Sequence, residues 1–150
     1  MQLDAIRAAH QIFMPIAGNR RLAMIGTQDI ANVATKLLCD RSWSGQSVIG
    51  LHGAADVSFD EAASILGQAL NQPINHVETT LDQFRDTLLQ LGATENVAAE
   101  YVEMWSSLAC PAYTPAEPRT LETTTPTTFI QFVQDKMLPL LRESATVQTP

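Results

Sequence analysis

A strand-turn-helix unit near the N-terminus constrains the fold of this chain most strongly. The segment Leu22-Ala-Met-Ile25 is apolar and has the length of a short buried strand, and Gly26-Thr27 follows it as a turn. Asp29 is predicted to cap the next helix, because its carboxylate accepts first-turn N–H bonds and faces the positive end of the helix dipole. A strand that turns directly into a helix is the unit from which α/β folds are built. The apolar face of this helix is expected to comprise Ile30, Val33, Ala34, Leu37 and Leu38.

The same alternation of strand and helix patterns continues along the chain. Two capping boxes mark helix starts, Ser58 with Glu61 and Thr80 with Gln83, because each side chain satisfies the other residue's backbone N–H. Gly92 is predicted to end the second of these helices. Further strands are predicted at 46–51 and 74–78, and helices at 2–14, 58–70, 80–91, 94–110 and 125–141.

These elements predict a single α/β domain over residues 1–141. It would contain three short strands with their crossover helices, and a helix-rich lobe over about 80–141. The remaining residues, 142–150, are predicted to form a disordered tail. Because three strands are few for a doubly wound sheet and leave unpaired strand edges, we expect that part of the sheet is missing or is supplied by another chain.

The charge of the chain argues against nucleic acid or an anionic membrane as a partner. Sixteen acidic and nine basic residues give a formal net charge of −7, whereas both partners favour basic surfaces. No apolar run is long enough to span a bilayer, and the first residues lack the pattern of a signal peptide, so a cytoplasmic location is expected. Cys39 and Cys110 lie far apart without CxxC spacing, which favours two reduced, packed thiols over a disulfide or a catalytic thiol.

The common catalytic and cofactor motifs are absent from the sequence. There is no GxGxxG, no GxxxxGK[ST], no GxSxG and no Tyr followed four residues later by Lys. His10, His52 and His76 are scattered and have no metal-ligand spacing, so no metal site is predicted. Arg20 and Arg21 precede the first predicted strand, either as binders of phosphate or carboxylate or as solvated strand ends.

Five segments of the chain, in order, resemble the NmrA-like proteins, the atypical short-chain dehydrogenase/reductase group. The segment from Met14-Pro-Ile through Arg20-Arg-Leu-Ala-Met-Ile-Gly-Thr-Gln-Asp-Ile-Ala resembles their "MP…R.LPM…RDIA". Trp43-Ser-Gly-Gln resembles a "W.G" turn. The segments 51–61, 66–73 and 116–129 resemble "L.GPEDLSY.E", "L...LG.P" and "AEPRT…TTPTSF", with Ala54 and Asn71 as departures from the family pattern.

The resemblance implies a partial Rossmann-like α/β fold with a small helical substrate lobe. In that family these motifs belong to the C-terminal half, whereas the N-terminal half carries the glycine-rich dinucleotide turn and most of the parallel sheet. The resemblance therefore implies that the chain is a truncated relative, with NAD(P) as the family cofactor and its pyrophosphate site outside this sequence.

The resemblance also indicates candidate site residues. Phe13, Met14 and Pro15 correspond to the segment that lines the substrate, with Met14 and Pro15 at the nicotinamide end of the cleft. Tyr101, Met104 and Trp105 fall in the lobe that covers the substrate, or else form an ordinary helix-packing stripe. Asp29 matches the family's Asp, with helix capping or direct catalysis as its two possible roles. No catalytic residue is identified.

Three functions are consistent with this sequence. The first is a binding or oligomerisation module without redox activity of its own, associating with further copies of itself. The second is an oxidoreductase or NAD(P)H sensor completed by a chain that supplies the missing half of the sheet. The third is a small-molecule carrier, with a cleft lined by Met14, Met24, Trp105 and Phe129.

Overall fold

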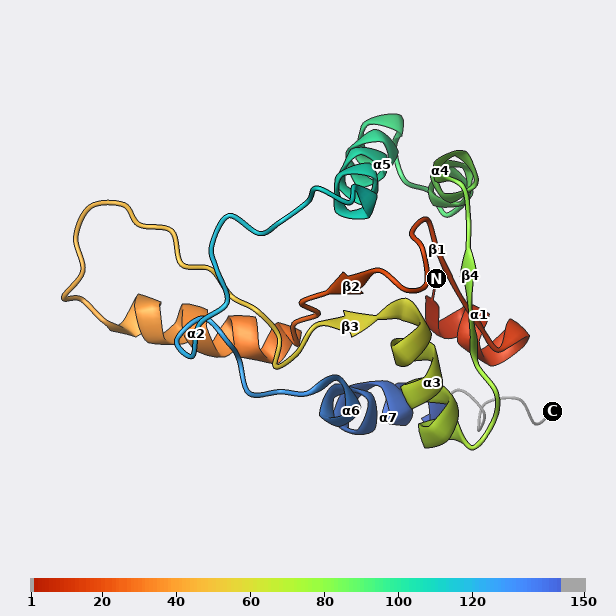
Figure 1. The fold of residues 1–150 in the computed structure, drawn as a ribbon, viewed down its shortest axis with the longest axis horizontal. Helices are drawn as coiled ribbons and strands as arrows, with labels where there is room; N and C mark the ends of the chain where they lie inside the picture. Colours follow the sequence, from red (N-terminus) through yellow and green to blue (C-terminus); the bar gives the residue numbers. More distant parts are fainter. Residues whose placement is uncertain (1, 144–150) are drawn as a thin grey trace. The chain divides into compact units, whose positions relative to one another are not determined.

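A computed structural model of the chain describes residues 2–143 (Figure 1). Within these residues the chain forms two compact units, the first of residues 2–20 and 58–114 and the second of residues 21–57 and 115–143. The elements in chain order are α1 (Gln2–Ala9), β1 (Gln11–Met14), β2 (Arg21–Leu22), α2 (Thr27–Cys39), β3 (Val57–Ser58), α3 (Phe59–Leu70), β4 (Asn75–Glu78), α4 (Leu81–Gln90), α5 (Glu95–Ala109), α6 (Phe129–Phe132), the π-helical turn η1 (Val133–Met137) and α7 (Leu138–Glu143).

The first unit is built around a parallel pair of strands, β1 and β4. Gln11 pairs with Asn75 at one end and Met14 with Glu78 at the other. The predicted helix over 2–14 is wrong in its second half, because α1 ends at Ala9 and His10 takes a left-handed φ of 56°. Burial then alternates along β1, with Ile12 and Met14 inside, which is the period of a strand.

Helices and aromatic side chains complete the core of the first unit. Trp105 of α5 contacts two buried phenylalanines, with ring centroids 6.0 Å from Phe59 and 6.3 Å from Phe84. Trp105 therefore joins α5 to α3 and α4. The buried apolar residues of this unit are Ile6, Ile12, Met14, Ile16, Phe59, Ala62, Ala63, Leu66, Ile74, Phe84 and Ala98.

The second unit contains little sheet. The predicted strand over 22–25 is reduced to β2, which pairs with the two-residue strand β3. The predicted strand over 46–51 is wrong: this segment is irregular, and only His52 after it forms an isolated bridge, with Thr124. Val48 and Ile49 are exposed, because no strand among residues 2–143 pairs with their segment.

Most of the predicted helix starts are confirmed. Both capping boxes form, Ser58 with Glu61 and Thr80 with Gln83, and Gly92 follows α4 with a φ of 91°. The last helical segment starts later than predicted. It begins at Phe129 rather than at Thr125-Pro126, because Thr128 makes its own capping box with Gln131.

Asp29 is not the N-cap of α2, so the predicted capping role is wrong. The helix begins at Thr27, and its N-cap, Gly26, makes no side-chain cap bond. Asp29 instead lies in the first turn, 4% exposed, and accepts bonds from the Thr127 backbone N–H (3.1 Å) and hydroxyl (2.8 Å). Its carboxylate therefore ties α2 to the segment that precedes α6.

The cysteines, the predicted tail and the length of the helices complete the comparison of prediction and structure. Cys39 and Cys110 are free, as predicted, but both are exposed rather than packed. Arg142 and Glu143 of the predicted tail belong to α7, and the rest of that tail lies outside the described residues. No helix within residues 2–143 is both long and apolar enough to cross a bilayer.

Candidate functional site

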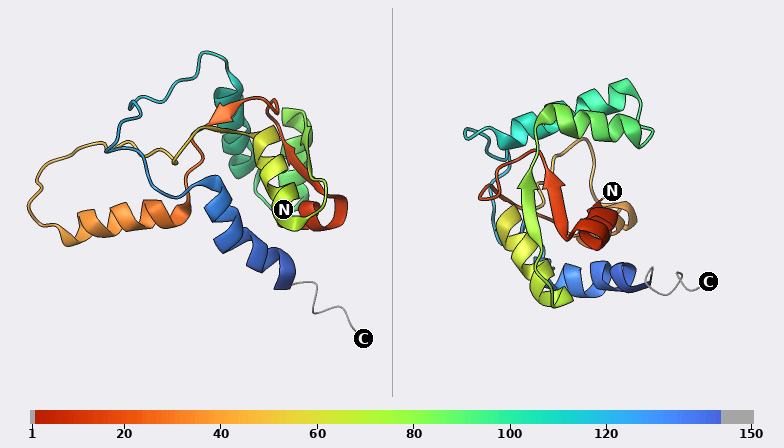
Figure 2. Two further views of the ribbon diagram at one scale, coloured as in Figure 1. Left: turned by 60° about the horizontal axis from the view of Figure 1, so that its bottom comes forward. Right: turned by 90° about the vertical axis from the view of Figure 1, so that its right-hand side faces the viewer.

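An open cavity of about 430 Å³ lies in the first unit, where the carboxyl ends of β1 and β4 meet α1 and α4. Phe13 is the last but one residue of β1, and Thr79 directly follows β4. Figure 2 (right) shows the two strands side by side, with α4 beyond their arrowheads. In open α/β sheets, ligands bind outside the carboxyl ends of the strands. The cavity is lined by Gln2, Asp4, Ala5, Phe13, Thr79, Phe84, Thr87 and Leu91.

Gln2 closes the free edge of β1 beside the cavity. Its side-chain amide donates to the Phe13 carbonyl (2.6 Å), and its side-chain oxygen accepts from the Phe13 backbone N–H (3.2 Å). This arrangement satisfies both backbone groups of Phe13 on the side away from β4, as a neighbouring strand would. The backbone of Phe13 is thus bonded along both edges of β1, and Phe13 lines the cavity.

Thr79 is the cavity residue with an unsatisfied polar group. Its backbone N–H donates to the Met14 carbonyl at 3.0 Å, which continues the β1–β4 ladder by one residue. Its hydroxyl oxygen is buried and has no hydrogen-bond partner. By contrast, the Thr87 hydroxyl in the same wall donates to the Gln83 carbonyl at 2.8 Å.

The residues predicted to line a substrate site are only partly brought together. Phe13 lines the cavity, whereas Trp105 lies behind it, against Phe84. Tyr101 and Met104 are exposed on α5 and do not line this cavity.

Met14 and Pro15, the residues expected at the nicotinamide end, are both buried in the first unit. Of the four residues proposed for a carrier cleft, Met14 and Trp105 belong to the first unit. Met24 and Phe129 belong to the second, where they line a small cavity of about 180 Å³.

Gln2, Thr79 and Phe84 were missed as site residues by sequence reasoning. Thr79 directly follows a strand that was predicted correctly, so its place at the end of that strand could have indicated a site residue. Its proximity to Phe13 was not predictable, because residues 11–14 were assigned to a helix.

His76 is a buried histidine on the α3 side of the first unit. Its side chain is 3% exposed, its ring contacts Phe59 at 5.4 Å, and its Nδ1 lies 4.0 Å from an Asp60 carboxylate oxygen. Its Nε2 is buried without a partner. Burial lowers the pKa of His76 below its ordinary value of 6.5, although the Asp60 and Glu78 carboxylates act in the opposite direction.

The lowered pKa of His76 predicts a loss of stability in mild acid. The folded state favours neutral His76, so the unfolded state binds the extra proton and stability decreases as the pH falls below about 6.5. Urea unfolding at pH 7.5 and at pH 5.5 measures this decrease. His76→Phe, which keeps a ring against Phe59, is expected to show a smaller decrease than the wild type. An equal decrease in both proteins would contradict the assignment to His76.

The Arg20 side chain bonds to backbone carbonyls and is not a solvated strand end. Its guanidinium donates to three carbonyls at and beyond the C-terminus of α5, those of Leu108 (3.0 Å), Cys110 (3.0 Å) and Tyr113 (3.4 Å). A cation here also interacts favourably with the helix dipole. Arg21, in the second unit, donates to the Asp56 carbonyl.

Arg20→Met is expected to lower the free energy of unfolding by about 1–2 kcal/mol, because it removes a charge and its bonds to the carbonyls at the end of α5. Urea unfolding followed by circular dichroism measures the loss. Arg20→Lys keeps the charge but loses the planar guanidinium, so its free energy of unfolding should lie between those of the wild type and Arg20→Met. The assigned role would be wrong if Arg20→Met unfolded at the wild-type urea concentration.

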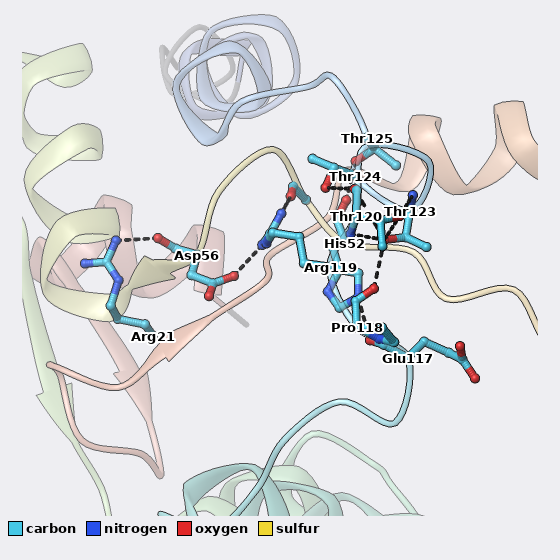
Figure 3. Close-up of polar contacts among 11 residues, drawn as sticks. Arg21, His52, Asp56, Glu117, Pro118, Arg119, Thr120, Thr123, Thr124 and Thr125 are labelled. Carbon is cyan, nitrogen blue, oxygen red and sulfur yellow. Dashed lines mark hydrogen bonds and ion pairs between the residues drawn. The ribbon is translucent and has the colours of Figure 1, made fainter.

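The second unit contains a polar network around His52 (Figure 3). The His52 backbone bonds the Thr123 carbonyl and the Thr125 N–H, both at 2.8 Å, and its ring Nε2 lies 3.0 Å from the Glu117 carbonyl. Arg119 donates to the Gly53 carbonyl and to the Asp56 carboxylate. These bonds hold the 115–125 segment against residues 52–56, so we assign them a structural role.

No protein-family model matches the chain. Over 113 residues, 75% of the chain, it is 30% identical to an NAD(P)H azoreductase of Xenophilus azovorans, and the match spans 38% of that protein. Among solved structures, it resembles a triphenylmethane reductase of Citrobacter sp. in complex with NADP(H), with a TM-score of 0.67 and 17% identity over 88% of this chain and 46% of that one. It also resembles a nucleoside-diphosphate-sugar epimerase of Staphylococcus aureus, with a TM-score of 0.63 and 20% identity over 89% and 46%.

The chain spans less than half the length of each of these proteins. Most of this chain matches just under half of each solved structure. The chain thus has a partial Rossmann-like α/β fold, with NAD(P)-binding reductases and epimerases as its structural neighbours.

Proposed function

We propose that this chain is the substrate-binding part of an NAD(P)-linked reductase, and that the cavity of the first unit holds an aromatic substrate. The observation that carries this proposal is the position of the cavity at the carboxyl ends of the parallel strands β1 and β4. Its wall is mainly apolar, with Phe13, Phe84 and Leu91 as the large side chains and few polar groups, which is typical of small-molecule sites.

The names of two relatives support an aromatic substrate. One is an NAD(P)H azoreductase, and the other is a reductase connected with triphenylmethane dyes. A phenyl ring fits between apolar walls of this kind, and aromatic pairs gain about 0.5–1.5 kcal/mol beyond the burial of their area.

We further propose that the chain by itself binds substrate without transferring hydride. The sequence contains no glycine-rich dinucleotide turn, and the two residues expected at the nicotinamide end are buried. Redox activity would then require a dinucleotide-binding part, either in the same polypeptide or in a second chain. NAD(P)H would supply the hydride, and the residues of this chain would orient the aromatic ring.

A dye-binding titration tests the proposed site. The probe is 4-hydroxyazobenzene, followed by its change in absorbance on addition of protein. Leu91→Asp places a carboxylate at the rim of the cavity, where Leu91 is 60% exposed, and is expected to weaken binding at least tenfold. Leu121→Asp is the matched control, because Leu121 is 98% exposed in the second unit and lines none of the first unit's cavity. Equal binding by both variants, or no binding by the wild type, would reject the site.

Calorimetric unfolding with and without NADPH or NADH tests the proposed lack of a complete cofactor site. We expect no change in the unfolding midpoint with either nucleotide. A ligand at about a hundred times its Kd adds roughly 2.7 kcal/mol, which raises the midpoint of a domain of this size by about 2–8 °C. A shift of that size would show that the chain forms a cofactor site of its own.

A second candidate role is the docking of a dinucleotide-binding half. It is favoured by the exposed apolar side chains of α2. Asp29 is the buried residue of this amphipathic helix, whereas Ile30, Leu37 and Leu38 are exposed, Leu38 to 80%. The strand-patterned segment 46–51 that follows α2 has no pairing partner among the described residues. Because the chain spans under half of its relatives, we propose that these surfaces receive a dinucleotide-binding half.

Co-purification tests the docking role. The chain is co-expressed with the part of the azoreductase that lies outside the match, carrying an affinity tag. Capture of the wild type is expected, with loss of capture for Leu38→Glu and retention for the exposed control Leu121→Glu. Light scattering of the chain alone is expected to give the mass of a monomer. A dimer that Leu38→Glu dissociates would show instead that a second copy covers α2.

A further inference from the structure

We propose that Thr79 selects the ligand of the first unit's cavity, and that this ligand is an aromatic compound with an oxygen substituent on its ring. The inference rests on the proposed function, because it concerns the same cavity and names the chemistry that the cavity would recognise. Three observations about the cavity wall lead to it: its apolar surface, its occupied polar groups and the single hydroxyl without a partner.

The other polar side chains of the wall already have partners. The Gln2 side chain is bonded to both backbone groups of Phe13, and the Thr87 hydroxyl to the Gln83 carbonyl. Asp4 accepts a bond from Arg7 at 3.3 Å. Among these lining side chains, the hydroxyl of Thr79 is the group that has no hydrogen-bond partner within the protein.

A hydrogen bond from a ligand to the Thr79 hydroxyl would also be favourable. A buried hydroxyl without a hydrogen bond destabilises the folded protein, and a ligand that bonds to it removes this cost. Thr79 lines the cavity, and a rotation of about 120° about its Cα–Cβ bond moves the hydroxyl into the position of the methyl group. The backbone of Thr79 stays fixed meanwhile, because its N–H donates to the Met14 carbonyl.

The chemistry of a hydroxyl determines which ligand group fits. A threonine hydroxyl both donates and accepts a hydrogen bond, so it can bind a phenolic hydroxyl or a ring carbonyl. It carries no charge and therefore gives no advantage to a carboxylate or an ammonium group in this apolar wall. The rings of Phe13 and Phe84 favour an aromatic body.

Matched probes and matched variants test this inference. The probes are 2-naphthol and 2-methylnaphthalene, which share shape and differ by one hydroxyl, and their affinities are measured by titration calorimetry. The wild type is expected to bind 2-naphthol about three- to tenfold more tightly, the effect of one net hydrogen bond. Thr79→Val should abolish this preference without weakening 2-methylnaphthalene. Thr79→Ser keeps a hydroxyl and should retain the preference for 2-naphthol. Thr87→Val should retain it as well, because the Thr87 hydroxyl that it removes is bonded to the Gln83 carbonyl and not to the ligand.

The outcomes separate this inference from the proposed function. If both probes bind wild type equally, or if Thr79→Val keeps the preference, the role of Thr79 is wrong while the aromatic site stands. If neither probe binds, both the site and the inference are rejected. Thr79→Val removes an unsatisfied hydroxyl and is isosteric, so it is expected to unfold no more easily than the wild type, and urea unfolding checks this.

Discussion

Gly53→Ala is expected to destabilise the second unit by about 3 kcal/mol, the upper end of the usual cost of overpacking. A Cβ atom at this position would lie 1.8 Å from the Met24 carbonyl oxygen and 2.6 Å from its carbon, distances at which the backbone itself must move. The Gly53 carbonyl also accepts a bond from Arg119, so a displaced backbone would disturb the network of Figure 3. Urea unfolding, together with amide hydrogen exchange of α2, measures the effect.

Gly26→Ala is the control for this prediction. It adds the same methyl group in the same unit, but its nearest neighbour is the Thr127 side chain at 3.7 Å, an ordinary contact. Gly26 is the N-cap of α2, where Ala is disfavoured, so a cost of at most about 1 kcal/mol is expected. Equal losses for the two alanine variants would show that the close approach to Met24 is not the cause.

Asp29→Ala is expected to lower the free energy of unfolding by roughly 1.5–3 kcal/mol, the cost of losing hydrogen bonds to a charged group. The substitution leaves the Thr127 backbone N–H without its acceptor, because both carboxylate oxygens bond to Thr127. It also removes an acidic side chain from the first turn of α2, where the helix dipole favours it. Chemical denaturation measures the loss.

A double-mutant cycle with Thr127→Val isolates the contribution of the Asp29–Thr127 pair. Thr127→Val removes the hydroxyl but keeps the backbone N–H, so its own cost is expected to be about 1 kcal/mol. The combined variant should lose less than the sum of the two single variants, because the two residues share a bond. Additive losses would mean that the hydroxyl contributes nothing to the effect of Asp29.

Helix boundaries in this chain were predictable because their signals are local. Ser58 with Glu61 and Thr80 with Gln83 are three residues apart, and their reciprocal bonds depend only on that spacing. Asp29 shows the limit of the same reasoning. A carboxylate near a helix start looks like a cap, but here the bonds to Thr127, 98 residues away, take both of its oxygens.

Strands were predicted less well, because a strand exists only when another segment pairs with it. Residues 46–51 have a strand pattern and no partner within the described residues, and they remain irregular. Residues 11–14 continue the spacing of α1, yet they form β1 because β4 lies parallel to them. Whether such a segment becomes a strand or stays irregular therefore depends on whether another segment pairs with it, and its own sequence pattern does not decide this.

The sequence by itself determined the helix starts, the acidic charge and the α/β class of this protein, since these depend on composition and on neighbours three or four residues apart. Only the tertiary structure decided which side chains form a site. Phe13 and Thr79 line one cavity because β1 and β4 are paired in parallel, and the Thr79 hydroxyl is unpartnered because of what surrounds it. Contacts between distant segments depend on burial and pairing across the whole fold, and no local spacing encodes them.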